Sequence, residues 1–206
     1  MQAARSVNAL RAYLKKNWAL DEGEMAVPGT APLRGFATYP LTAQEHDPKV
    51  QYRNTLPCPQ SRVENVLQAI PGLAVVAREA TQLAEAFAAK RGEGVDLKLH
   101  NFHILRQSED TASGSSFDYH VDQKDVSLGP LDVSVSVKLT QDPPEGSGSW
   151  MQMQGGEAEP YGKKAGSCIV FKSKAMHRSI ATTQDMGTVL KVVFFFEVSG
   201  GSTLSV

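Results

Sequence analysis

The sequence predicts an α+β protein that is mainly β, with helices in its first half and a jelly roll of antiparallel strands in its second half. Two observations carry this prediction. Hydrophobic residues recur at helical spacing at the N-terminus and again between residues 61 and 92. From Val95 onwards apolar positions alternate with polar ones in short runs. A series of short antiparallel strands favours a double-sheet jelly roll.

The expected helices cover residues 2–19 and two segments between residues 61 and 92. The apolar face of the first consists of Val7, Leu10, Leu14 and Trp18. Ser61 and Glu64 match a capping box at the start of the second helix, which Pro71-Gly72 ends. The third helix carries Val76, Ala80, Leu83, Ala84 and Phe87 on one face. We expect all three to pack on the outside of the sheet, because each has a single apolar stripe.

The strands of the second half are separated by segments rich in Gly, Ser, Asp and Pro. These turn-rich segments are 108–116, 141–148, 155–166 and 182–187. Residues 132–140 show the clearest alternation, and residues 188–196 form the last strand. We therefore expect a single domain over residues 1–206, with a helical front (1–94), a jelly-roll core (95–198) and a tail (199–206).

Residues 20–59 show little periodicity and contain scattered prolines. We interpret this segment as an irregular arm that wraps over the core. A long stretch without regular structure is uncommon in a compact domain unless it is functional. The arm would therefore either cover the mouth of the barrel or form an ordered wrap away from the chemistry.

Composition and charge weaken the case for tight non-specific nucleic-acid binding, although they do not exclude a nucleobase substrate. The net charge of -1, with 41% hydrophobic and 21% charged residues, creates no global field that would recruit nucleic acid or a membrane. No apolar run reaches membrane-spanning length, and the first residues do not read as a signal peptide. The two cysteines, Cys58 and Cys168, do not suggest a disulfide framework. We expect a reducing intracellular location, cytoplasmic or nuclear.

One short motif carries the chemistry of the chain. His120 and Asp122 are two residues apart in a segment that reads as extended, so their side chains point to the same face. His177, far downstream, can complete three ligands on one side of a metal. Two imidazoles and one carboxylate, with coordination positions left open, form the ligand set of non-haem Fe(II) oxygenases. The motif therefore predicts an iron site, although a His-x-Asp tripeptide also occurs by chance.

Further motifs follow in a characteristic order. The strand of residues 149–154 leads into Gly155-Gly156-Glu157, and residues 165–171 end in Val-Phe before His177 and a last strand with a basic residue. Over residues 95–198 this series resembles the 2-oxoglutarate- and Fe(II)-dependent dioxygenases, in the layout of the prolyl-4-hydroxylase-like branch. The resemblance implies a double-stranded β-helix with iron on His120, Asp122 and His177. It also implies 2-oxoglutarate as co-substrate, dioxygen, and ascorbate as a reductant.

The same resemblance implies that Lys191 binds the distal carboxylate of 2-oxoglutarate. In that branch the basic residue usually lies nearer the distal histidine, at the position of Gly187 here. Lys191 is an even number of residues further on, so it keeps the same strand face. Its neighbours on that face are apolar, and a buried ammonium calls for a carboxylate partner unless it reaches water. Arg106 lies where related enzymes place a polar co-substrate contact, and a surface position is its simpler interpretation.

Several functions stay open at this level. The prime substrate of a dioxygenase could be a protein side chain such as proline, a nucleobase, or a small molecule. A basic region is more simply a solvated outer face, and otherwise it would attract an anionic substrate; its members are Lys163, Lys164, Lys172, Lys174 and Arg178. A cupin-like metalloenzyme would use a similar barrel without needing Lys191. A barrel that binds a metal or metabolite without catalysis is the remaining alternative.

Overall fold

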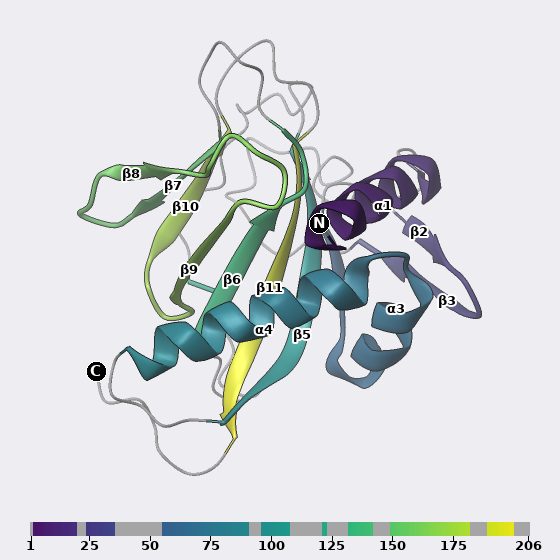
Figure 1. The fold of residues 1–206 in the computed structure, drawn as a ribbon, viewed down its shortest axis with the longest axis horizontal. Helices are drawn as coiled ribbons and strands as arrows, with labels where there is room; N and C mark the ends of the chain where they lie inside the picture. The colour runs from purple at the N-terminus through teal and green to yellow at the C-terminus, as the bar shows by residue number, and fades with distance from the viewer. Residues whose placement is uncertain are drawn as a thin grey trace, which may run out of the picture.

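The computed structural model describes residues 2–19, 24–35, 55–90, 96–107, 121–122, 132–141, 149–181 and 189–199. Within them the largest element is a five-stranded antiparallel sheet with the order β4-β5-β11-β6-β9 (Figure 1). Its strands are β4 (Thr55–Cys58), β5 (Asp96–Gln107), β11 (Val189–Ser199), β6 (Val133–Lys138) and β9 (Cys168–Lys172). Long β5 and β11 pair at its centre, with a β-bulge between Phe195 and Phe196.

Two smaller antiparallel sheets accompany the large one. The first has the order β10-β7-β8 and consists of β10 (His177–Ala181), β7 (Ser149–Met153) and β8 (Ala158–Pro160). The second has the order β1-β2-β3 and consists of β1 (Trp18–Ala19), β2 (Glu24–Val27) and β3 (Thr30–Arg34). Strand β10 begins at His177, one of the three metal ligands predicted from the sequence.

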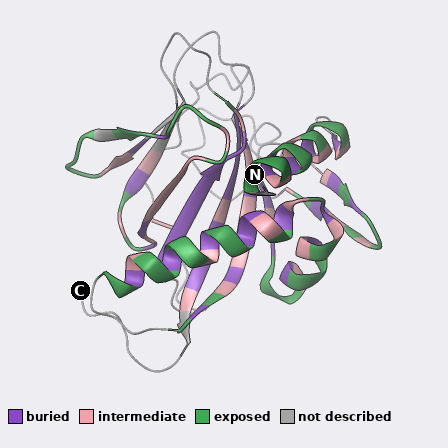
Figure 2. Cartoon of the chain, viewed as in Figure 1, coloured by how far each residue is buried: buried purple, intermediate pink, exposed green. Residues whose placement is uncertain are grey.

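The helices lie against the large sheet, as the sequence predicts. They are α1 (Gln2–Asn17), the 3-10 helix η1 (Gln60–Arg62), α3 (Val63–Ala69) and α4 (Leu73–Ala89). Helix α4 runs across one face of the five-stranded sheet and contacts β5, β6, β9 and β11, and α1 packs against α4 (Figure 1). The side of α4 turned away from the sheet is exposed (Figure 2). Among the described residues no helix is both long and apolar enough to cross a membrane.

The junction between α1 and α4 depends on one glycine. Gly72 precedes α4 with a φ of 82°, in the left-handed region that residues with a Cβ rarely adopt. A Cβ at this position would collide with the backbone carbonyl of Ser6 in α1. Gly72 therefore permits both the sharp entry into α4 and the close approach of the two helices.

The two faces of the large sheet differ in character. The face under α4 forms the hydrophobic core, and its strand residues are Phe102, Ile104, Val133, Val135, Val137, Val192, Phe194 and Phe196. Burying one such Val or Phe side chain contributes about 1.5–3 kcal/mol to folding. The opposite face, which we call the site face, carries Ser134, Ser136, Lys138 and Lys191, all of which are buried. Strand β6 is therefore buried on both faces (Figure 2).

The expectation of an irregular arm over residues 20–59 is wrong for the described part of that segment. Residues 24–34 form the β2–β3 hairpin, and β4 joins the edge of the five-stranded sheet beside β5. Strand β4 was not predicted because it contains Pro57, and proline is unfavourable inside a sheet. On an edge strand such as β4, however, a proline is tolerated. Residues 36–54 lie outside the described residues.

Three smaller expectations are also corrected. Ser61 does not cap a helix: it lies inside η1, and Arg62 occupies the N-cap of α3 without a side-chain capping hydrogen bond. Leu83 is 40% exposed, because the buried side of α4 runs through Ala80 and Ala84 instead. The segment expected as a turn over residues 155–166 contains the short strand β8.

Candidate functional site

Two of the three predicted metal ligands lie in contact with each other, next to the site face. Asp122 Oδ1 is 3.6 Å from His177 Nε2, and the two side chains are 8% and 4% exposed. His177 begins β10, while the backbone N–H of Asp122 donates to the carbonyl of Ser173 in the turn before β10. The predicted third ligand, His120, lies outside the described residues. Within those residues, no group of three or more His, Cys, Asp or Glu could hold a metal ion.

The neighbours of His177 determine which of its two ring nitrogens carries the proton. Burial lowers the pKa of His177, and the hydrogen bond with the Ala175 carbonyl opposes this only in part, so the ring is neutral near pH 7. Nδ1 lies 2.9 Å from that carbonyl oxygen, which can only accept, so Nδ1 carries the proton. Nε2 therefore presents its lone pair. The Phe171 ring packs against the imidazole at 4.5 Å between centroids.

Two serines hold the carboxylate of Asp122 in place. Ser134 Oγ donates a 2.6 Å hydrogen bond to Oδ2, and Ser134 Oγ is 2.9 Å from Ser173 Oγ. Because the single hydroxyl proton of Ser134 goes to Asp122, Ser173 is the donor in the second bond. Both serines are fully buried. The contact fixes Oδ2 against β6 and leaves Oδ1 as the oxygen that faces His177.

This geometry fits a bound cation. A carboxylate oxygen and an imidazole lone pair, both acceptors, converge at 3.6 Å in a buried setting. Two acceptors cannot hydrogen-bond to each other, whereas a metal ion between them would satisfy both. The Nδ1 contact to a backbone carbonyl is also the usual way in which a metal-binding histidine is oriented.

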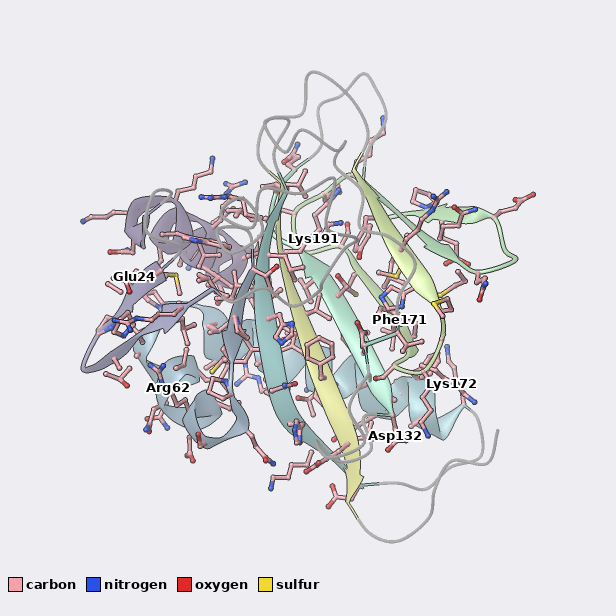
Figure 3. All side chains as sticks on the ribbon, turned by 180° about the vertical axis from the view of Figure 1, so that it is seen from behind. Glu24, Arg62, Asp132, Phe171, Lys172 and Lys191 are labelled. Carbon is pink, nitrogen blue, oxygen red and sulfur yellow. The ribbon has the colours of Figure 1, made fainter. Side chains whose placement is uncertain are left out.

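A buried lysine lies further along the site face. Lys191 is 2% exposed, and its Nζ lies 4.6 Å from the centroid of the Tyr161 ring. Figure 3 looks onto this face with α4 behind the sheet and labels Lys191 and Phe171 on it. Tyr161 Oη donates a 2.8 Å hydrogen bond to Ser136 Oγ, and burial raises the pKa of the phenol, so the group stays neutral. Because Lys191 is almost completely buried, the interpretation that its ammonium group reaches water is wrong.

Arg106 is not brought to this site. It pairs with Leu190 across β5 and β11, whereas Lys191 pairs with Leu105, so Arg106 lies on the core face. Its guanidinium packs over the Trp18 ring at 4.8 Å. Arg106 is 8% exposed, so the interpretation as a surface arginine does not hold either.

Sequence reasoning missed four residues of the site. They are Ser134, Lys138, Tyr161 and Ser173. Ser134 and Lys138 are polar positions in the alternation of β6, which sequence reasoning used only as a strand signal. Tyr161 follows β8 in a segment that reads as a turn, and it forms a small apolar cluster with Met151 and Phe171 beside His177.

Comparison with known proteins supports the fold. No protein-family model matches the sequence, and no curated protein matches it. A prolyl-4-hydroxylase from Pseudomonas putida matches with a TM-score of 0.55 and 19% identity, covering 94% of this chain and 87% of that one. AviO1 from Streptomyces viridochromogenes Tue57 matches with a TM-score of 0.55 and 14% identity, covering 94% and 83%. A prolyl 4-hydroxylase from Phytophthora capsici reaches 0.50 at 15% identity, covering 70% and 48%.

These similarities show that the chain shares the fold of prolyl-4-hydroxylases. The ordered motifs in the second half of the sequence resemble those of the same proteins, and the structural similarities confirm this resemblance at the level of the fold. At identities of 14–19% they leave the substrate open.

Proposed function

We propose that the protein is an Fe(II)- and 2-oxoglutarate-dependent dioxygenase that hydroxylates a C–H bond of its substrate. The convergence of Asp122 Oδ1 and His177 Nε2 at 3.6 Å, on a prolyl-4-hydroxylase fold, carries this proposal. His120 is the proposed third ligand, because it completes the His-x-Asp motif with Asp122 in the sequence. The five-stranded sheet and the β10-β7-β8 sheet would be the halves of a double-stranded β-helix.

Each described residue of the site then has a defined role. Asp122 and His177 hold the metal, and Ser134 with Ser173 keeps the carboxylate oriented. Bound iron, with dioxygen, supplies the oxidation: 2-oxoglutarate becomes succinate and carbon dioxide while one oxygen atom enters the substrate.

Lys191 binds the distal carboxylate of 2-oxoglutarate from a buried position beside the Tyr161 ring. The protein thus contributes orientation, exclusion of water and charge complementarity, while the iron carries the redox chemistry.

A protein side chain such as proline is the proposed prime substrate, because prolyl-4-hydroxylases share this fold. A nucleobase is the alternative. Within the basic region that would favour it, the Arg178 guanidinium donates to Gln152 Oε1 through bonds of 2.9 and 2.6 Å, while Lys163, Lys164 and Lys174 are exposed. A cupin-like enzyme would not need Lys191, and a barrel that binds a metal or metabolite without catalysis would produce no succinate.

The test is succinate production by the purified protein with Fe(II), 2-oxoglutarate, dioxygen and ascorbate in the presence of a cell lysate. Asp122→Ala and His177→Ala should abolish it, because each removes a ligand, whereas the exposed Glu159→Ala should retain it. Mass spectrometry of the lysate should then find a gain of one oxygen on a peptide. Metal binding without succinate would support the cupin-like alternative, and no metal binding would overturn the proposal.

A further inference from the structure

Asn101 on β5 carries a buried polar atom without a partner. Its side-chain oxygen Oδ1 is shielded from water, and no group in the described part of the chain donates a hydrogen bond to it. Buried polar atoms are nearly always hydrogen-bonded, because leaving an acceptor without a donor lowers stability. An exception of this kind calls for a donor that comes from outside the chain.

The sheet turns this side chain towards the site face. Asn101 pairs with Phe195 of β11, and Phe195 pairs with Ser134 of β6. Directly paired residues of antiparallel strands project to the same side, so these three residues form one row across the site face. Phe195 is buried outside the hydrophobic core that lies under α4, as a residue of the site face must be.

A β-bulge next to Asn101 keeps it on that face. Leu99 pairs with Phe196, so His100 is the extra residue of β5. Leu99 packs against the core although it is only two residues from Asn101, and residues at that spacing in a regular strand share a face. The bulge therefore separates the polar side chain from the core. Bulges are common beside active sites, where they redirect a side chain.

The row lies level with the metal ligands. Ser134, at its β6 end, donates a hydrogen bond to Asp122 Oδ2. Neighbouring strands are about 4.7–4.9 Å apart, so the backbones of Asn101 and Ser134 are separated by roughly 9–10 Å. Lys191 lies four residues from Phe195, roughly 13 Å along β11 and away from the Asp132 end of the sheet (Figure 3). A co-substrate that extends from the metal to Lys191 thus points away from the row of Asn101.

We propose that Asn101 Oδ1 accepts a hydrogen bond from a backbone N–H of a peptide substrate and so positions the target side chain at the metal. This inference rests on the proposed function and names a residue that binds its prime substrate. A side-chain carbonyl oxygen can only accept, so its partner is an N–H or O–H group. A peptide offers a backbone N–H at every residue except proline.

The charge at this end of the site face favours a peptide over a nucleic acid. Glu197 lies two residues beyond Phe195 on β11, and its Oε2 is 2.8 Å from Nδ1 of the buried His100. A carboxylate beside Asn101 is an unfavourable neighbour for the phosphates of a nucleic acid, and the net charge of the chain is also negative, at -1.

The first test measures the stability of the free protein. Asn101→Leu keeps the approximate shape of the side chain and removes the oxygen that lacks a partner. Its urea midpoint should equal or exceed that of the wild type, because the free protein loses no hydrogen bond of this oxygen. A structural role of the amide predicts a lower midpoint and would overturn the inference. Asn65→Leu, at an exposed position of α3, is the matched control and should unfold like the wild type.

The second test measures substrate recognition. Succinate production is titrated with two probes, the protein of a nuclease-treated cell lysate and the nucleic acid extracted from the same lysate. Protein should stimulate the wild type. In Asn101→Leu the half-saturating protein concentration should rise roughly tenfold or more, because a substrate N–H is left unpaired. The affinity of the Mn(II)-loaded variant for 2-oxoglutarate should stay within about threefold of the wild type. Asn65→Leu should match the wild type in both measurements.

The outcomes separate this inference from the proposed function. A wild type that forms no succinate with either probe overturns the proposed function together with the inference. Stimulation by nucleic acid alone rejects the peptide, and an unchanged half-saturating concentration in Asn101→Leu rejects the role of Asn101 alone. A tenfold loss of 2-oxoglutarate affinity would mean that Asn101 contacts the co-substrate instead. Should the leucine variant fail to fold, Asn101→Ala introduces no larger group. It should show the same rise in half-saturating concentration, and a wild-type value would again reject the inference.

Discussion

Ser134 Oγ donates a 2.6 Å hydrogen bond to Asp122 Oδ2, and this bond decides which carboxylate oxygen faces His177. Ser134 belongs to β6, a strand that is buried on both faces. The rigid sheet therefore orients the carboxylate, and Ser173 extends the support into the turn before β10. Residues that orient metal ligands in this way affect metal affinity without contacting the metal.

Ser134→Ala should accordingly weaken metal binding. We expect the affinity for Mn(II) to fall about 10–100-fold, because the carboxylate loses the partner that holds Oδ2. Titration calorimetry of the metal-free protein measures this. Ser136→Ala is the matched control: it changes the same strand and face but contacts Tyr161 instead of Asp122. Equal Mn(II) affinities for the two variants would contradict the role of Ser134.

The ring of Tyr161 should matter more for co-substrate binding than its hydroxyl. Lys191 Nζ lies over the ring at 4.6 Å, a cation–π contact worth about 0.5–2 kcal/mol. Tyr161→Phe keeps this contact and loses only the hydrogen bond to Ser136, whereas Tyr161→Leu loses both. We expect 2-oxoglutarate affinity to fall about 2–30-fold in Tyr161→Leu and to stay near wild type in Tyr161→Phe. The reverse order would show that the hydroxyl contacts the co-substrate.

The parts of the fold that sequence could predict are those with a local signal. The alternation in β6 and the run of β11 identify strands because every second residue enters the core. The stripe of α4 identifies a helix for the same reason, although Leu83 turned out to lie outside it. β4 was missed because four residues that include a proline are too few to show an alternation of polar and apolar residues. Its pairing with β5 joins residues that are far apart in the sequence, so it has no local signal.

The candidate site divides in the same way. Asp122 and His177 could be named because their residue types and order carry chemical information, and their role as metal ligands stays a prediction. The position of Lys138 beside Lys191 could not be predicted, because it depends on the register between β6 and β11, and register depends on how distant strands pair. Arg106 was assigned to the wrong neighbourhood for a related reason, since only the pairing shows that its face is that of the core.

Gly72 should be much less tolerant of substitution than Gly29. Both have a positive φ, of 82° and 70°, so alanine at either position costs about 1–2 kcal/mol of backbone strain. At Gly72 the added Cβ also collides with the Ser6 carbonyl, whereas at Gly29 it meets no described atom within 4 Å. Overpacking of this kind costs about 1–3 kcal/mol more. Urea unfolding of Gly72→Ala and Gly29→Ala measures the difference, and equal losses of stability would show that α1 moves away without cost.

His103 should make the protein less stable in mild acid. It lies on the site face of β5 opposite Val193, with its ring 4.8 Å from that of Phe195. Burial lowers its pKa from 6.5 to about 4. Because the folded pKa is the lower one, the unfolded chain binds more protons between these values. The contribution of the neutral His103 to the free energy of unfolding is therefore fully present above about pH 6.5, and it decreases as the pH falls towards 4.

The contribution of this one group between pH 7 and pH 5 is about 2 kcal/mol. His103→Phe keeps an aromatic ring and removes the titrating group, so its stability should depend less on pH by that amount. Urea unfolding of the wild type and the variant at both pH values gives the comparison, in which carboxylate titration common to the two proteins cancels. If the wild type and the variant lose the same stability between pH 7 and pH 5, His103 is protonated in the folded protein without cost. Its ring would then reach water.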